Sequence, residues 1–209
     1  MPRTSITETE IREALIAAAR ELFLENGIRA VEIKTIAEKA GLHRSTLYRH
    51  AMDKNQLAFY VVEQEMRELV ALDLERLNAL PSRGYDRLEA FCHLLLDDFE
   101  SRPNLLRLLN EFDAIYTDDY PDIPEANDYV ITMQRLHHST VQLVLEGLAD
   151  HSLTNIPDVS AFSNMLNNTI LGLSLRFFPR EKHYAEEQNA SGRKTIEEFI
   201  RITLSAVKA

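Results

Sequence analysis

Apolar residues recur every three or four positions along almost the whole chain, and no segment alternates apolar and polar residues as a half-buried strand would. This pattern predicts an all-α fold of about nine helices. We expect three short N-terminal helices followed by a larger helical domain, with helices at about 8–26, 32–40, 43–49, 53–80, 85–101, 103–116, 125–149, 158–178 and 194–207.

Two capping boxes indicate where the longer N-terminal helices begin. Thr7 is followed three residues later by Glu10, and Asp53 is followed by Gln56 at the same spacing. In a capping box each of the two side chains accepts a hydrogen bond from a free backbone N–H group at the start of the helix. Gly27 is placed to end the first helix, because glycine commonly follows the last helical turn.

The charge distribution divides the chain into two parts. The net charge of −10 on its own argues against binding to nucleic acid, which depends on lysine and arginine. Nine of the 23 basic residues but only eight of the 33 acidic residues lie in residues 1–60, so the acidic excess belongs to the rest of the chain. We therefore expect a DNA-binding domain over 1–52 and a second domain over 53–209.

Residues 31–57 carry the most informative motif. Two short amphipathic helices are expected to meet at Gly41, and the second has Arg, His, Ser, Thr and Tyr residues on its outer side. A helix-turn-helix presents its second helix to the DNA major groove with polar side chains of this kind. The segment is therefore interpreted as a helix-turn-helix.

Residues 8–60 resemble the TetR family of repressors. The family pattern of an aromatic-containing first helix, then I-A-x-x-A-G, then T-L-Y and a lysine at the start of the fourth helix is present. It is formed here by Leu22-Phe23, Ile36-Ala37-Glu38-Lys39-Ala40-Gly41, Thr46-Leu47-Tyr48 and Lys54.

The resemblance implies roles for individual side chains. Hydroxyl and lysine side chains suit phosphate, and arginine suits the O6 and N7 atoms of guanine. The phosphate contacts implied are Thr46, Tyr48 and Lys54, the groove-facing residues are Arg44, Ser45, Arg49 and His50, and Lys34 and Thr35 complete the expected set. The chain departs from the family pattern at Glu32, His43 and Ala51, which replace two helix caps and an aromatic residue.

The resemblance also implies a homodimer that binds palindromic operator DNA and releases it when a small-molecule effector binds. The last two expected helices, separated by the stretch from Pro179 to Gly192, would pair with a second subunit. The dimerisation residues are expected to be Phe162, Leu166, Leu173, Phe177, Ile196, Phe199, Ile200 and Thr203.

The effector is expected to bind among the fifth to eighth helices, where apolar residues are mixed with a few inward polar groups. These groups are His93, Asn110, Tyr116, His137 and Asn167. Such a site calls for a mostly apolar ligand and a cavity of roughly 300 Å³. A packed core without a cavity would instead indicate a dimeric DNA-binding adaptor that senses nothing.

Other chemistry is less well supported by the sequence. No hydrolase, nucleotide-binding or metalloprotease motif occurs, so we expect no catalytic residues and no cofactor. His93 and Asp97 share a helix face, but a metal site needs at least three convergent ligands, and none is predicted. Cys92 is expected to be a buried thiol rather than a redox switch.

Two further expectations concern the surroundings of the protein. The acidic residues in and beside the loop from Tyr116 to Pro124 are interpreted as solvated rather than as a site for a cationic ligand. They are Asp113, Asp118, Asp119, Asp122, Glu125 and Asp128. No segment reaches the roughly 18 apolar residues that a membrane span requires, and we expect a cytoplasmic protein.

Overall fold

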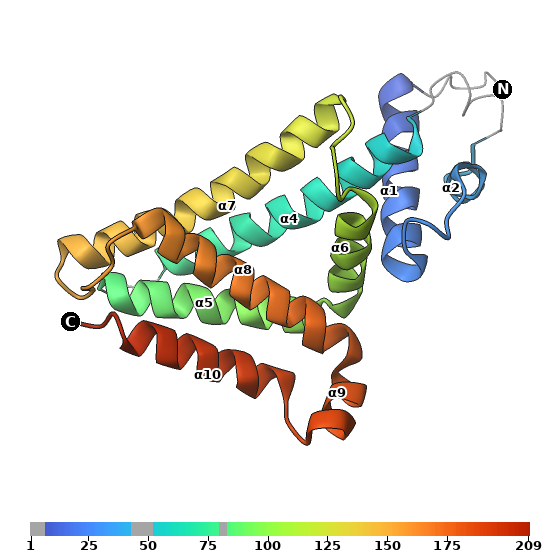
Figure 1. Cartoon of the computed structure of the whole chain (residues 1–209). Helices are drawn as coiled ribbons and strands as arrows, with labels where there is room; N and C mark the ends of the chain where they lie inside the picture. Colours follow the sequence, from blue (N-terminus) through green and yellow to red (C-terminus); the bar gives the residue numbers. More distant parts are fainter. Residues whose placement is uncertain (1–6, 43–51, 80–82) are drawn as a thin grey trace. The chain divides into compact units, whose positions relative to one another are not determined.

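The computed structural model describes residues 7–42, 52–79 and 83–209, apart from the side chains of 72–74. The described part is helical, as the sequence pattern predicts (Figure 1). Its helices are α1 (Glu8–Asn26), α2 (Ile33–Lys39), α4 (Lys54–Asn78), α5 (Gly84–Ser101), α6 (Pro103–Ile115), α7 (Pro124–Ala149), α8 (Val159–Phe177), η1 (Phe178–Arg180), α9 (Glu181–Gln188) and α10 (Gly192–Ser205). None of these helices combines the length and apolar character needed to cross a bilayer.

Both predicted capping boxes are present. The Glu10 backbone N–H donates to the Thr7 hydroxyl, and the Glu10 carboxylate accepts from the Thr7 backbone N–H at 2.7 Å. At α4 the Gln56 N–H donates to Asp53 at 2.9 Å, and the Asp53 N–H donates to the Gln56 amide oxygen at 3.0 Å. The third expected helix, 43–49, lies outside the described residues.

The chain forms two compact units that do not follow a single cut in the sequence. The first contains residues 1–65 and 107–130, and the second contains residues 66–106 and 131–209. Helices α4, α6 and α7 each contribute to both units. The boundary predicted between residues 52 and 53 concerns the DNA-binding domain as a sequence module, and it stays a prediction.

The core of the first unit lies where α1 and α2 meet the first turns of α4. Leu15, Phe23, Ile36 and Leu57 are each at most 1% exposed. Ion pairs join Arg20 to Glu65 and Lys39 to Glu21 at the edge of this core. The N-terminal helices are thus held mainly by apolar packing, with charged pairs outside it.

In the second unit α5, α8 and α10 run alongside one another (Figure 1). Their contact surfaces contain fully buried leucines and isoleucines, including Leu88, Leu166, Ile196 and Ile200. Arg193 of α10 adds hydrogen bonds to the Asp97 and Glu100 carboxylates of α5. The apolar stripes of α8 and α10 are therefore largely covered by the chain's own α5.

The stretch from Pro179 to Gly192 is not a plain connection as expected, since it contains α9. This helix buries none of its residues, and the ring of its Tyr184 lies 4.3 Å from that of Phe177. Asn189 ends it in the left-handed conformation at φ 49°. A helix without a buried face has no apolar periodicity by which it could be recognised.

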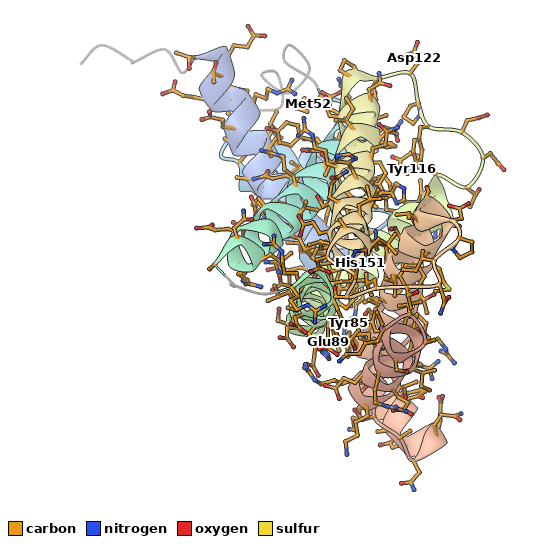
Figure 2. All side chains as sticks on the ribbon, turned by 90° about the vertical axis from the view of Figure 1, so that its left-hand side faces the viewer. Met52, Tyr85, Glu89, Tyr116, Asp122 and His151 are labelled. Atoms are coloured by element: carbon orange, nitrogen blue, oxygen red, sulfur yellow. The ribbon has the colours of Figure 1, made fainter. Side chains whose placement is uncertain are left out.

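The start of α5 is fixed by the loop that follows α7. Asp150 and the Ser152 hydroxyl each accept a hydrogen bond at 2.8 Å, from the backbone N–H groups of Gly84 and Tyr85. A Cβ atom at Gly84 would lie 2.2 Å from the Gly147 backbone, so the close approach of the two helices requires glycine here. Figure 2 shows Tyr85 next to Glu89 on α5, and the two side chains are hydrogen bonded at 3.2 Å.

Candidate DNA-binding segment and ligand cavity

Three of the nine expected DNA-binding residues are described. Lys34 and Thr35 lie exposed on α2, and the Lys34 ammonium is 3.8 Å from the Glu32 carboxylate. Lys54 opens α4. Outside the described residues lie Arg44, Ser45, Thr46, Tyr48, Arg49 and His50.

Lys54 is bound to the loop between α1 and α2. Its ammonium donates a hydrogen bond to the Arg29 carbonyl at 3.3 Å. Because an ammonium group has three N–H donors, this contact leaves donors for a phosphate. The Asp53–Gln56 capping box fixes the first turn of α4 and therefore the position from which Lys54 extends.

The same loop is held by α6. The Glu111 carboxylate accepts hydrogen bonds from the backbone N–H groups of Ile28 at 2.6 Å and Arg29 at 2.9 Å. The Arg29 guanidinium in turn donates to the Ala114 carbonyl at 2.9 Å. Gly27 has φ 81°, and a Cβ atom there would lie 2.3 Å from the Glu111 carboxylate. Sequence analysis missed Glu111.

Glu125, one of the acidic residues expected to be solvated, is buried. Only 7% of its side chain is exposed, and it accepts hydrogen bonds from Arg12 of α1 at 3.1 Å and Gln56 of α4 at 3.5 Å. The expectation of a solvated side chain is wrong for this residue, because burial here is compensated by a cationic partner. The other acidic residues of the set are exposed.

Tyr116 belongs to an aromatic cluster rather than to a ligand site. Its hydroxyl donates to Asn55 at 2.8 Å, and burial raises its pKa to about 12. The cluster has ring centroids 4.6 to 6.4 Å apart, which is the usual range for packed aromatic pairs. Its members are Phe59, Phe112, Tyr116, Tyr120 and Tyr129.

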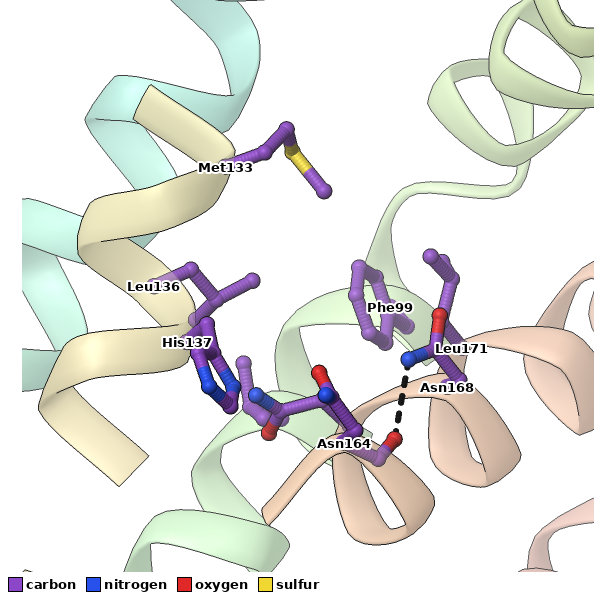
Figure 3. Close-up of a pocket in the computed structure, with 9 residues that line it drawn as sticks. Phe99, Met133, Leu136, His137, Asn164, Asn168 and Leu171 are labelled. Atoms are coloured by element: carbon purple, nitrogen blue, oxygen red, sulfur yellow. Dashed lines mark hydrogen bonds between the residues drawn. The ribbon is translucent and has the colours of Figure 1, made fainter. Parts of the chain in front are cut away.

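A cavity of about 210 Å³ lies between α5, α7 and α8 in the second unit (Figure 3). Its lining residues are Leu95, Phe99, Met133, Leu136, His137, Asn164, Asn167, Asn168 and Leu171. Of the five expected ligand-binding residues, the structure brings together His137 and Asn167. Sequence analysis missed Asn164 and Asn168.

The other three expected ligand-binding residues lie elsewhere. Asn110 is exposed on α6, because the buried stripe of that helix runs through Leu105, Leu108, Leu109 and Phe112. His93 is half-buried on α5 and does not line the cavity. Tyr116 is in the aromatic cluster. None of the three lines this cavity, and their assignment to a ligand site stays a prediction.

The polar side of the cavity is partly hydrogen bonded. The Asn168 amide N–H donates to the Asn164 backbone carbonyl at 2.9 Å (Figure 3). The Thr140 hydroxyl is 3.0 Å from the Asn167 amide oxygen. His137 Nε2 is 3.2 Å from the Ser160 hydroxyl, whereas its buried Nδ1 has no hydrogen-bond partner.

A second depression, of about 290 Å³, lies against α4 and another face of α7. Its chemistry differs from that of the cavity, because two arginines and a histidine line it. The lining residues are Arg67, Val70, Ala71, Thr132, Arg135, His138 and Ser139. Helix α7 thus contributes both to a cavity without lysine, arginine or carboxylate side chains and to a depression that contains two arginines.

The expected dimerisation residues divide into two groups. Leu166, Phe177, Ile196 and Ile200 are buried in this chain, at 0 to 7% exposed, and form part of its own core. Their burial within the chain does not support their assignment to a dimer interface, which stays a prediction. Phe162, Leu173, Phe199 and Thr203 are half-buried, and the exposed apolar residues beside them are Met165 on α8 and Ile202 on α10.

Comparison with known proteins identifies the N-terminal module. Residues 15–61 match the family model described as "Bacterial regulatory proteins, tetR family". The N-terminal module is therefore one of the TetR family. The chain is 34% identical to an HTH-type transcriptional regulator of Staphylococcus aureus over 61 residues, which are 29% of this chain and only 33% of that protein.

Similarity over a longer stretch links the chain to other transcriptional regulators. It is 25% identical to the repressor KstR2 of Mycolicibacterium smegmatis over 172 residues, 80% of each protein. In fold it is similar to KstR2 of Mycobacterium tuberculosis, with a TM-score of 0.66, 14% identity and 95% of each chain covered. It is also similar to FadR of Bacillus subtilis in complex with stearoyl-CoA, with a TM-score of 0.70, 14% identity and coverage of 93% of this chain and 98% of that one.

Proposed function

We propose that this TetR-family regulator is a homodimeric repressor that binds a palindromic operator and is released by a small molecule bound between α5, α7 and α8. The observation that carries the proposal is the cavity, which combines an apolar wall with polar groups of α7 and α8. Ligand sites in proteins commonly have this composition. The structural neighbour FadR, in complex with stearoyl-CoA, gives a precedent for a ligand in this fold.

The exposed apolar residues of α8 and α10 support the dimer. Met165 is 43% exposed and Ile202 is 53% exposed, with Phe162, Leu173 and Phe199 beside them. Gly172 has open space above its Cα, so a partner helix could approach α8 closely there. An exposed apolar face of this kind favours a subunit interface.

Helix α7 is a continuous helix that could transmit a change at the cavity to the DNA-binding module. It is continuous from Pro124 to Ala149, and its residues Met133, Leu136 and His137 line the cavity. Near its N-terminus, Glu125 is hydrogen bonded to Arg12 of α1. A ligand that shifts or rotates α7 by a small amount would therefore act on α1, and a coupling of about 1 to 3 kcal/mol is sufficient for effector control.

The adaptor that senses nothing is the alternative function. The cavity of about 210 Å³ is smaller than the roughly 300 Å³ expected for a ligand site, which favours this alternative. Two observations argue against the adaptor: His137 Nδ1 is buried without a hydrogen-bond partner, and the lining mixes apolar and polar groups. An empty cavity left by imperfect packing is usually apolar.

Filling the cavity separates the two functions. We would replace Met133, which lines the cavity, with tryptophan, and would use Ile131→Trp, at an exposed position of the same helix, as the control. In an operator-reporter strain grown on a panel of carbon sources, M133W should repress under every condition, whereas the wild type and I131W should be induced under at least one. Identical responses of all three proteins would contradict the proposed sensing.

A further inference from the structure

Among the residues that the structure shows lining the cavity there is no lysine, arginine, aspartate or glutamate. Leu95, Phe99, Met133, Leu136 and Leu171 form its apolar wall. Its polar side consists of His137 and three asparagines, Asn164, Asn167 and Asn168. A carboxylate or phosphate bound among these residues would lose part of its hydration without a lysine or arginine to replace it, which is unfavourable for a charged group.

The hydrogen-bonding groups that remain free are of both kinds. The Asn168 amide N–H is used by the Asn164 carbonyl, which leaves the Asn168 amide oxygen as an acceptor. The Asn167 amide oxygen accepts from the Thr140 hydroxyl, which leaves the Asn167 amide N–H groups as donors for a ligand. His137 Nδ1 is buried without a partner. A matching ligand needs at least one donor and one acceptor.

The volume limits the size of the ligand. An apolar cavity of about 150 Å³ holds one benzene molecule. In proportion, the 210 Å³ present here holds about eight or nine non-hydrogen atoms. A molecule of this size is a single ring or a short branched chain with one polar head.

We propose that the effector is a small uncharged molecule with an apolar body of about one ring and a head that both donates and accepts hydrogen bonds, such as a carboxamide. This inference rests on the proposed function, because it assigns a ligand class to the same cavity. Anionic molecules are disfavoured in the cavity because no lysine or arginine lines it. The basic depression on the other face of α7 is a separate place where an anion could bind.

Three isosteric probes test the ligand class. Benzamide is uncharged with a donor and an acceptor, acetophenone has an acceptor only, and benzoate is an anion near pH 7. In a thermal-unfolding assay of the full-length protein at millimolar probe concentration, benzamide should raise Tm by a few degrees, acetophenone by less, and benzoate not at all through this site.

Variants assign the effect to the cavity. Asn167→Leu should abolish the Tm increase caused by benzamide, because it removes a hydrogen-bonding group of the cavity. The variant should still fold, since Thr140 keeps its hydrogen bond to the Leu136 carbonyl and the apolar wall is retained. Asn110→Leu, an exposed asparagine outside the cavity, is the matched control and should respond as the wild type does. A Tm increase with benzoate that survives Asn167→Leu would report a site elsewhere, such as the basic depression, and would agree with the inference.

Several results would overturn the inference. They are no Tm increase with benzamide, an equal increase in wild type and N167L, or an increase with benzoate that Asn167→Leu removes. Operator release, measured in the same samples by fluorescence anisotropy, tests the proposed function separately. Benzamide binding without operator release would reject effector-controlled repression but keep the ligand class. Operator release by an anion that depends on Asn167 would keep effector-controlled repression but reject the ligand class.

Discussion

The carboxylate of Glu111 accepts the backbone N–H of Ile28 at 2.6 Å, across 83 positions of sequence. With the second bond from Arg29, it satisfies two backbone donors that the end of α1 leaves free in the following loop. This loop also accepts a hydrogen bond from Lys54. Glu111, together with the Ala114 carbonyl that accepts from the Arg29 guanidinium, therefore holds this loop to α6.

Glu111→Ala should lower the free energy of unfolding by about 1 to 3 kcal/mol, because two backbone N–H groups lose a charged acceptor. Glu111→Gln should cost less, since one amide oxygen remains. Urea unfolding monitored by circular dichroism measures both. Glu13→Ala, at an exposed position of α1, is the control and should stay within about 0.5 kcal/mol of the wild type. Equal stability of E111A and E13A would show that the contact contributes nothing.

The dimer face gives a second prediction. Ile202→Glu should yield monomers, because it places a charge in the proposed interface. Ile131→Glu, an equally apolar and exposed position on α7, should leave the dimer intact. Sedimentation velocity distinguishes the two forms, and an unchanged dimer for I202E would remove α10 from the interface. Phe177→Glu is unsuitable, since Phe177 is buried and its replacement would unfold the chain.

Replacing Arg44 and replacing Lys54 should change DNA affinity in different ways. Arg44→Ala should cost about 1 to 3 kcal/mol on the operator and little on random DNA, as expected for a contact to a base edge. Lys54→Ala should weaken binding to both DNAs by similar factors and reduce the salt dependence by about one ion, as expected for a phosphate contact.

Fluorescence anisotropy titrations at several salt concentrations measure both quantities for each variant. Equal losses of R44A on operator and random DNA would assign Arg44 to positioning instead. An unchanged salt slope for K54A would assign Lys54 to its structural contact with Arg29.

The acid stability of the protein should depend on Asp150. Hydrogen bonds from Ser152 and from the Gly84 N–H lower the pKa of Asp150 to about 2. A carboxylate whose pKa is lower in the folded than in the unfolded chain stabilises the fold above the unfolded value of about 4, and that contribution is lost as the pH falls toward 2. The difference in unfolding free energy between wild type and Asp150→Asn should therefore shrink over this range.

Thermal unfolding at intervals between pH 2 and 7 measures that difference. Asp118→Asn, which removes an exposed acidic residue, should follow the wild type throughout. A stability difference for D150N that is constant from pH 7 to pH 2 would show that the charge on Asp150 plays no part.

Some features were predictable from sequence because they depend on neighbours along the chain. The capping boxes at Thr7 and Asp53 each require two side chains three residues apart, and both are present. By contrast, α9 has helix-forming residues but no buried face, so the apolar periodicity gives no signal for it.

The site residues were harder to predict because their roles depend on distant segments. An apolar stripe predicts that Ile196 and Ile200 are covered, but it does not say whether the chain's own helices or a partner cover them. Glu111 and Asn168 carry no local sequence signal, since the loop and the cavity they meet are formed by other helices.

The proposed function depends on the chain binding a palindromic operator as a dimer. The direct test is to select bound sequences from a random duplex library, and then to measure the stoichiometry and affinity on the selected site and on random DNA. We expect two half-sites about one helical turn, or 34 Å, apart, one dimer per site, and a preference of at least about 10³-fold over random DNA. Enrichment of no sequence, or tight binding of a monomer to a single half-site, would contradict it.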